Sequence, residues 1–412
     1  MRVGLFTDVY PPYVNGVSTS VLMLKNSLEQ LGHKVYVVTV SNTTFKYVYE
    51  DYGKVMKIPG LPIGIYDYRL TGVYHFRAMR KIKRWKLDVI HSHTEFGVGT
   101  FARIIAHRFD LPLVHTYHTM YEDYIHYITK GYFNGISKKI VEHLSLFYCD
   151  KTNTELVVPT KKTYDLFKEK YKLDRNIHIV PTGIEVKKFH KEQFESNEIE
   201  QLKTKLGISK KDFVLLFVGR IAAEKNIKFL LDEQKKLSKL YKNLKLVIVG
   251  DGPDFEKHKK QVIAKAYNNS VIFTGKVPLK EVVKYYQLGD IFVTASTSET
   301  QGLTVIEAMA ASMPVVAIKD ESFINVVVDD LNGYLFKTKK EYLEIIKDLY
   351  QDTKKLNRLK KQSRLNSEIY SSKYYGERIL KVYQTAIENY KTNQKRNLLY
   401  YIKKVVGKIW KK

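Results

Sequence analysis

The sequence predicts an α/β protein made of two doubly wound halves that follow one another along the chain. Short β-branched runs alternate with longer amphipathic stretches, and this alternation occurs once before and once after a polar stretch near residue 200. Such a rhythm is typical of parallel sheets that helices cover on both faces. A chain of 412 residues is long enough for two such Rossmann-like domains, each with its own core.

The first series of elements lies in the amino-terminal half. Strands are predicted over residues 2–7, 34–40, 88–91 and 113–115. Helices are predicted between them, over residues 17–31, 98–109 and 135–147. Together they predict a first domain over residues 1–190.

The second series begins after residue 200. Strands are predicted over residues 213–218, 244–249, 271–273, 291–294 and 315–318, again separated by helices. The boundary is predicted in the segment 181–185 and the polar stretch 187–201, which has few apolar residues and no clear period. We therefore expect a second domain over residues 200–375 and carboxyl-terminal helices over 376–412.

The composition restricts the class of protein. Hydrophobic residues make up 44% of the chain and aromatic residues 13%, which excludes a disordered chain. The single cysteine, Cys149, excludes an intramolecular disulfide framework and favours a reducing cytosol, where a buried thiol acts as a small hydrophobe. The sequence has neither an apolar run of about 20 residues nor a signal peptide, so we expect a protein that stays inside the cell.

The charge requires an anionic partner. With 69 Lys and Arg against 43 Asp and Glu, the net charge is +26. Nucleic acid, a membrane surface and phosphorylated small molecules are the three partners that fit such a balance. Only 13 of the basic residues are Arg, the side chain that reads bases bidentately, and this disfavours nucleic acid.

Two segments combine basic and apolar residues at helical spacing, as helices at a membrane surface do. The first has Phe76, Met79 and Ile82 on one stripe, and its predicted membrane-binding residues are Arg77, Arg80, Lys81, Lys83, Arg84, Trp85 and Lys86. The second spans residues 391–412, carries eight Lys or Arg and no acid, and has Lys403, Lys404 and Trp410 as its predicted membrane contacts. The alternative for each is a helix that packs its apolar stripe on its own domain.

Candidate phosphate-binding features follow strands in both halves. Gly16 precedes the first predicted helix, but the chain has no G-x-G-x-x-G motif there, which disfavours nicotinamide cofactors. Arg220 and Lys225 lie five residues apart across a strand-to-helix turn and can close together on a diphosphate. Gly302 opens a helix whose free amides can meet a phosphate.

Two carboxylates accompany these features. Glu299 and Glu307 are separated by about 12 Å of rise even in a continuous helix, which is too far for the carboxylate pair of a retaining hydrolase. We expect them to contact different parts of one extended ligand.

The ordered set Gly219-Arg220, Glu224-Lys225-Asn226, Gly250-Asp-Gly-Pro253, Gly275 and Glu299-x7-Glu307 resembles the retaining GT-B glycosyltransferases that use nucleotide-diphosphate sugars. In the amino-terminal half, four motifs are similar to those of the bacterial 1,2-diacylglycerol 3-glucosyltransferases: Gly16-Val-Ser-Thr-Ser20, His91-Ser-His-Thr-Glu-Phe96, His115-Thr-Tyr-His-Thr119 and Tyr121-Glu-Asp-Tyr124. The resemblance covers about residues 1–380 and implies a GT-B fold, two Rossmann-like domains facing each other across a cleft. One departure is Thr182, where many members have Asn.

The resemblance also implies roles for individual residues. Arg220 and Lys225 would hold the donor diphosphate, Glu307 would bond the ribose hydroxyls, and Gly16 would lie near the phosphates. The catalytic pair would be His118, which faces the transferred sugar, and Glu299, which meets sugar and phosphate together with the amides of Gly302, Leu303 and Thr304.

The expected activity is transfer of glucose from UDP-glucose to the 3-hydroxyl of diacylglycerol at the cytoplasmic face of the membrane, with an anionic lipid surface as a further partner. Another glycolipid, a polyprenyl carrier or a polysaccharide remains an alternative acceptor, and galactose an alternative sugar. A nucleic-acid-binding protein on the same fold is a more remote alternative. No cofactor is expected because the UDP-sugar is a substrate, and the need for a divalent ion stays open. The four residues His91, His93, His115 and His118 lack a cysteine or carboxylate at zinc spacing, which disfavours a metal site.

Overall fold

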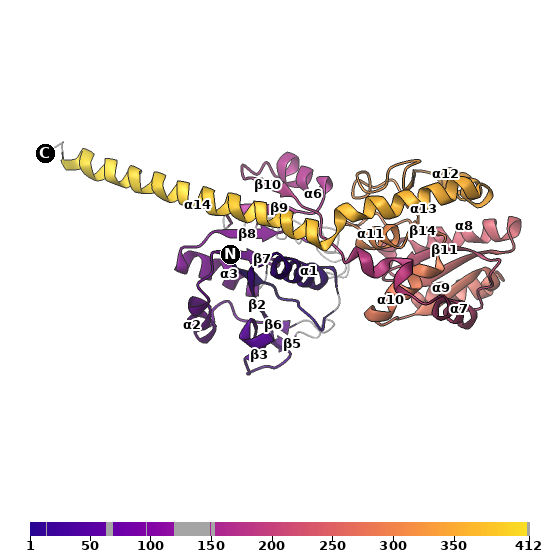
Figure 1. The fold of residues 1–412 in the computed structure, drawn as a ribbon, viewed down its shortest axis with the longest axis horizontal. Helices are drawn as coiled ribbons and strands as arrows, with labels where there is room; N and C mark the ends of the chain where they lie inside the picture. The colour runs from indigo at the N-terminus through magenta and orange to yellow at the C-terminus, as the bar shows by residue number, and fades with distance from the viewer. Residues whose placement is uncertain (14, 63–68, 96, 119–148, 150–152, 410–412) are drawn as a thin grey trace. The chain divides into compact units, whose positions relative to one another are not determined.

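The chain folds into two compact units (Figure 1). The computed structural model describes residues 1–13, 15–62, 69–95, 97–118, 149 and 153–409. The first unit consists of Met1–Gly183 together with Ser372–Lys412, and the second of Ile184–Ser371. This division differs from the predicted boundaries, because residues 184–190 belong to the second unit and the carboxyl-terminal helix belongs to the first.

The first unit is built on a sheet whose strands are almost all parallel. Over the described residues the strand order is β10-β9-β8-β7-β1-β2-β4-β3, and only β3 pairs antiparallel, with β4. The strands are β1 (Arg2–Phe6), β2 (Lys34–Val40), β3 (Val48–Glu50), β4 (Val55–Ile58), β7 (Val89–Ser92), β8 (Leu113–Thr116), β9 (Glu155–Val158) and β10 (Ile177–Ile179). A separate two-stranded pair consists of β5 (Leu61–Pro62) and β6 (Arg69–Leu70).

Helices connect these strands and bury the apolar sheet on both sides. They are α1 (Gly16–Gln30), α2 (Phe76–Trp85), α3 (Gly97–Phe109), α6 (Lys161–Asp165) and α14 (Ser372–Ile409), with short turns η1 (Asp51–Gly53) and η3 (Leu166–Lys170). One core cluster lies between the sheet, α1 and α14, and another lies beneath α2 and α3. The Cys149 side chain is buried and forms no disulfide, as predicted.

The long helix α14 closes the first unit (yellow in Figure 1). Its buried residues recur at helical spacing, which produces one apolar face. They are Tyr375, Ile379, Val382, Tyr383 and Ala386. The side chains from residue 393 onward, including Lys403 and Lys404, and the whole of Trp410 lie outside the described residues, so their membrane contact stays a prediction.

The basic segment predicted near residue 80 is helix α2, and one of its predicted membrane residues is misassigned. Trp85 is 6% exposed and stacks on Tyr36 of β2, with ring centroids 4.7 Å apart. The inward stripe of α2 consists of Ala78, Met79, Ile82 and Trp85. The three- and four-residue spacing of this stripe brings Trp85 onto the sheet, so it belongs to the core and not to a lipid contact. Phe76, expected on the inward stripe, is instead 61% exposed.

The second unit is a parallel sheet of order β13-β12-β11-β14-β15-β16 in the described residues. Its strands are β11 (Phe213–Val218), β12 (Leu244–Val249), β13 (Val271–Gly275), β14 (Ile291–Thr294), β15 (Val315–Ile318) and β16 (Gly333–Phe336). Its helices are α7 (Ser196–Lys205), α8 (Ile227–Leu240), α9 (Phe255–Ala264), α10 (Leu279–Tyr285), α11 (Leu303–Ala310), α12 (Lys339–Gln351) and α13 (Thr353–Ser367). Short turns are η4 (Val186–Phe189), η5 (Lys191–Gln193), η6 (Ala223–Lys225), η7 (Asn268–Ser270), η8 (Tyr286–Leu288) and η9 (Glu368–Tyr370).

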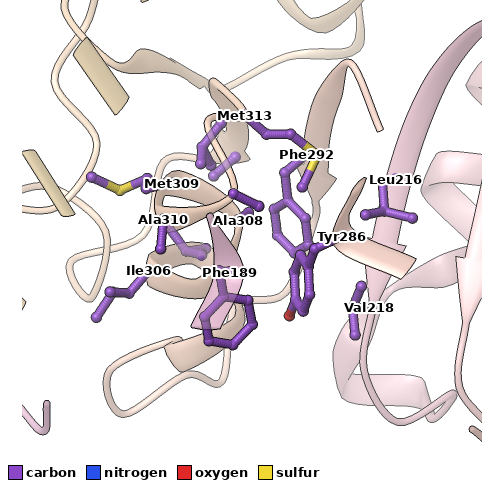
Figure 2. Close-up of a cluster of buried hydrophobic side chains, with 14 of the residues drawn as sticks. Phe189, Leu216, Val218, Tyr286, Phe292, Ile306, Ala308, Met309, Ala310 and Met313 are labelled. Atoms are coloured by element: carbon purple, nitrogen blue, oxygen red, sulfur yellow. The ribbon is translucent and has the colours of Figure 1, made fainter. Parts of the chain in front are cut away.

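A buried cluster fixes α11 to this sheet. Ile306, Met309 and Ala310 of α11 belong to one buried cluster with Phe189 of η4, and Figure 2 shows Phe292 of β14 next to Tyr286 of η8. All the side chains that Figure 2 labels are apolar apart from the Tyr286 hydroxyl. The position of α11 is therefore set by packing, and its polar residues are free to serve a site.

The predicted elements in the described residues are confirmed. The strands predicted at 34–40, 213–218, 244–249, 291–294 and 315–318 have the predicted bounds, and the other predicted strands and the helices predicted at 17–31 and 98–109 differ by at most two residues at either end. The helices predicted over 376–412 are instead one helix, α14, which begins at Ser372. The helix predicted at 135–147 lies outside the described residues. Among the helices described, none is both long enough and apolar enough to cross a bilayer.

Candidate active site

The candidate donor site begins where strands β11 and β12 end side by side. Gly219 follows β11 and Gly250 follows β12, and both have positive φ values. A Cβ atom on Gly250 would lie 1.9 Å from the Gly219 carbonyl oxygen. The two loops therefore meet backbone to backbone at the carboxyl edge of the sheet, which is the edge where open α/β sheets bind ligands.

Arg220 and Lys225 both lie on the loop that leaves β11. Arg220 forms an ion pair with Glu224, and the arginine side chain is 40% exposed. After the short turn η6, Asn226 adopts a left-handed conformation with φ 49° and begins α8. The loop thus holds two cations close to the edge of the sheet, and the guanidinium is open to solvent.

Lys225 is held by a carboxylate from a distant part of the sequence. It forms an ion pair with Glu299, which follows β14, and both side chains are less than one-fifth exposed. A charged pair in such a shielded place is screened less by salt than a surface pair. The structure therefore brings together two residues predicted for the site, Lys225 and Glu299.

Helix α11 begins in the same segment, after Gly302. Gly302 has a φ of 72°, and a Cβ atom there would lie 2.5 Å from Cε1 of the buried Phe323. Glycine is therefore required for the helix to start at this point. Leu303 and Thr304 form its first turn and are partly exposed, so their amides, which have no acceptor within the helix, can face a ligand.

Glu307 lies further along α11 and is the site residue with the most perturbed ionisation. Its Oε2 atom accepts a hydrogen bond of 2.5 Å from the Tyr286 hydroxyl. Burial raises the pKa of Glu307 to about 7, although the Tyr286 hydrogen bond lowers it. The side chain is still partly exposed, so a ligand can reach the carboxyl group.

Two further residues predicted for the site, Gly16 and His118, lie in the first unit. Gly16 is exposed at the start of α1, with open space where a side chain would stand, and Asn15 caps this helix by accepting a 2.8 Å hydrogen bond from the Ser18 amide. His118 follows β8 and is partly exposed. Its Nε2 atom lies 3.0 Å from Nδ1 of His93, which follows the neighbouring strand β7.

The histidines around His118 are neutral near pH 7. Burial lowers the pKa of His118 to about 4, with a smaller contribution from His115 and an opposing one from Glu95. The pKa values of His91 and His93 also lie well below the usual range because both rings are buried. His118 can thus offer a ligand a neutral imidazole but not a cation.

The rest of the histidine cluster is bonded into the core. His91 lies 2.8 Å from the Tyr383 hydroxyl and 2.6 Å from Thr116, while His115 lies 3.3 Å from the Glu95 carboxylate. In the described part of the chain, no group of three or more His, Cys, Asp or Glu side chains is arranged to hold a metal ion.

Sequence reasoning missed three contacts of the predicted residues. Glu224 lies in a motif quoted for the resemblance but is given no role there, Tyr286 lies in none of the quoted motifs, and His93 is given no role beyond its place in a motif and the disfavoured metal site. Each contacts a predicted site residue, namely Arg220, Glu307 and His118.

Family models match both halves of the chain. Residues 14–188 match the model described as Glycosyltransferase Family 4. Residues 198–366 match the model described as Glycosyl transferases group 1. Each match falls almost entirely within one unit.

Two curated relatives are similar over almost the whole chain. The alpha-monoglucosyldiacylglycerol synthase of Acholeplasma laidlawii is 36% identical over 403 residues, which is 96% of this chain and 100% of that protein. The alpha-monoglucosyldiacylglycerol synthase of Streptococcus pneumoniae is 36% identical over 392 residues, or 94% of this chain and 86% of that protein.

Among solved structures, Anabaena HepE in complex with UDP superposes with a TM-score of 0.71 at 16% identity, over 93% of this chain and 100% of that chain. Two Rossmann-like units of this kind, with these family matches, define a glycosyltransferase of the GT-B fold. More narrowly, the chain belongs to the glycosyltransferase family that includes the alpha-monoglucosyldiacylglycerol synthases.

Proposed function

We propose that this glycosyltransferase moves glucose from UDP-glucose to the 3-hydroxyl of 1,2-diacylglycerol, with retention at the anomeric carbon, while it is bound peripherally to the cytoplasmic face of the membrane. The product is monoglucosyldiacylglycerol. The observation that carries the proposal is the 36% identity with a synthase of that name along 96% of the chain. The same fold in HepE, which was solved with UDP-glucose, supports a nucleotide-sugar donor.

The donor loop supports the chemistry of the leaving group. Cleavage of the anomeric C–O bond leaves negative charge on the terminal phosphate of the nucleotide and positive character on the sugar. Arg220, Lys225 and the first-turn amides of α11 provide positive charge and dipoles fixed in advance for that phosphate. Stabilisation of this kind is usually the largest contribution to catalysis. The departing phosphate takes the proton of the acceptor hydroxyl.

His118, Glu299 and Glu307 act on the other parts of the donor. Glu307 accepts hydrogen bonds from the ribose hydroxyls, and Glu299 contacts the sugar once the diphosphate engages Lys225. The neutral imidazole of His118 hydrogen-bonds the transferred sugar and supplies no proton, because its pKa of about 4 keeps it unprotonated near pH 7. Gly16 is proposed to lie near the phosphates, on the family resemblance alone, and a side chain at this position would meet open space.

The outward face of α2 supports binding to an anionic leaflet. Its exposed basic side chains are Arg77, Arg80, Lys83, Arg84 and Lys86, with Lys81 partly exposed. Exposed apolar residues stand at its amino-terminal end, namely Val73, Tyr74 and Phe76. Basic and apolar side chains together suit a lipid surface, where each Lys or Arg contributes about 1 kcal/mol. The proposed acceptor, diacylglycerol, is itself a membrane lipid and is present in the same leaflet. Lys403, Lys404 and Trp410 are proposed as further contacts on the sequence alone.

A transfer assay tests the proposal. Purified chain is incubated with radiolabelled UDP-glucose or UDP-galactose and detergent-dispersed diacylglycerol, and the lipid products are separated by thin-layer chromatography. The expected product is one glucolipid whose anomeric proton coupling indicates the α configuration. Parallel incubations contain a glycolipid, a polyprenyl phosphate or a polysaccharide. Transfer to one of these but not to diacylglycerol would overturn the proposed acceptor, and a β-linked product would overturn retention.

A further inference from the structure

Tyr286 has an isolated polar group inside an apolar cluster. Its side chain is fully buried, with the ring centroid 5.3 Å from that of Phe189 and 6.3 Å from that of Phe292 (Figure 2). Phenylalanine would fill this position equally well by shape. The hydroxyl is therefore the part of the residue that packing does not explain, and a buried hydroxyl needs a hydrogen-bond partner.

The partner of this hydroxyl is one oxygen of Glu307. Tyr286 donates to Oε2 at 2.5 Å, whereas in the described part of the chain no side chain or amide donates to Oε1. Because Tyr286 is held by packing on two sides, its hydrogen bond fixes the rotation of the carboxyl group. One oxygen is occupied from within the core, and the other is left to a ligand.

Charged residues on the elements next to α11 do not orient the Glu307 carboxyl in place of Tyr286. Besides η8, which carries Tyr286, the elements packed against α11 include η4, α13 and β15, and β15 has no charged residue. On η4, Lys188 pairs with Glu185, and on α13, Arg364 pairs with Glu192 and Lys360 with Asp290. Tyr286 is the titratable group that acts on the Glu307 carboxyl in addition to burial.

We propose that Tyr286 is a positioning residue of the nucleotide site, whose hydroxyl orients the Glu307 carboxylate to accept hydrogen bonds from the two hydroxyls of a ribose. This inference rests on the proposed use of a nucleoside diphosphate sugar. It makes Tyr286 part of the selection for a ribose over a deoxyribose, although the tyrosine does not itself contact the ligand.

The test measures nucleotide binding and not sugar transfer. UDP and 2′-deoxy-UDP are titrated into the full chain by calorimetry at pH 8, where Glu307 is mostly ionised, for the wild type and Tyr286→Phe. We expect the substitution to weaken UDP about tenfold, as for a lost hydrogen bond to a charged group, and 2′-deoxy-UDP much less. Tyr285→Phe, on the preceding residue and packed against the same cluster, is the matched control and should bind as the wild type does.

A double-substitution cycle separates positioning from a loss of packing. In a Glu307→Gln background, Tyr286→Phe should have no further effect on UDP affinity, because the carboxylate it orients is gone. A further loss of the same size in that background, or an unchanged affinity in Tyr286→Phe alone, overturns the inference. If Tyr286→Phe does not fold, the hydroxyl is structural and the inference is also overturned. A wild type that binds no UDP would instead contradict the proposed donor.

Discussion

The ammonium group of Lys225 forms an ion pair with the carboxylate of Glu299, which lies 74 positions further along the chain. Both side chains are largely shielded from solvent. In this state the positive charge proposed to meet a diphosphate is already neutralised. A diphosphate that binds here must compete with Glu299 for Lys225, and the displaced carboxylate becomes available to another part of the donor.

This competition predicts opposite effects of Glu299→Gln on binding and on turnover. Removing the carboxylate leaves Lys225 without its counter-ion, so UDP should bind more tightly, by about tenfold for a charge interaction of this kind. Turnover should fall by about two orders of magnitude or more if Glu299 contacts the reacting sugar. Calorimetry with UDP and steady-state rates with UDP-glucose measure the two effects. Weaker UDP binding in this variant would contradict the competition.

Substitution of the two cations, Lys225 and Arg220, should have effects on UDP binding opposite to that of Glu299→Gln. Lys225→Ala and Arg220→Ala should each weaken UDP binding and reduce turnover by about two to three orders of magnitude, because each removes charge from the developing phosphate. Lys228→Ala is the matched control, since Lys228 lies nearby on α8, is exposed, and pairs with Asp232. Its rate should stay within about twofold of the wild type, as for a surface ion pair of small energetic effect.

The sequence predicts candidate residues for this site but not the contacts that they make. Glycines after strands, paired cations and the Glu299-x7-Glu307 spacing are local patterns, so they could be found by position alone. The contact between Tyr286 and Glu307 depends on how η8 packs against α11, and no local pattern encodes that packing. The contact between His93 and His118 depends on β7 and β8 being neighbours, which the alternating pattern allows but does not specify.

The neutral histidines make the stability of the first unit depend on pH. The folded pKa of His118, about 4, lies below the ordinary value of 6.5, so the unfolded chain binds a proton that the folded chain does not. Stability is therefore lost as the pH falls from about 6.5 towards 4, by up to about 3 kcal/mol for this one group. Thermal unfolding followed at pH 7, 6 and 5 should show the melting temperature falling with pH.

Substitution of His118 tests whether the pH dependence of the melting temperature comes from its buried ring. His118→Asn should reduce the fall in melting temperature between pH 7 and 5, because the unfolded state then gains one proton fewer. His107→Asn, on the exposed surface of α3, should leave the fall as it is in the wild type. Equal falls in the wild type and His118→Asn would mean that His118 is protonated equally in both states.

Helix α2 illustrates what helical spacing predicts and what it leaves open. The alternation of basic and apolar residues correctly indicated an amphipathic helix, but the prediction of Trp85 as a membrane-binding residue is wrong, because Trp85 is buried. A helix has a fixed period, and the inward stripe defined by Met79 and Ile82 continues to Trp85. The position of Trp85 in the helical period therefore determines that its side chain is buried, whatever the charge of the adjacent residues.

This division of α2 into two faces predicts two separable phenotypes. Replacing Arg77, Arg80, Lys83 and Arg84 together by Gln should remove about 4 kcal/mol of attraction to an anionic leaflet, or about a thousandfold in vesicle binding. Folding should be unaffected because these side chains are exposed. Trp85→Ala should instead cost about 3–5 kcal/mol of stability, since it removes a buried ring that stacks on Tyr36. Sedimentation with anionic and zwitterionic vesicles measures the first effect and thermal unfolding the second. Unchanged sedimentation of the fourfold variant with anionic vesicles would show that the basic face of α2 is not the membrane contact.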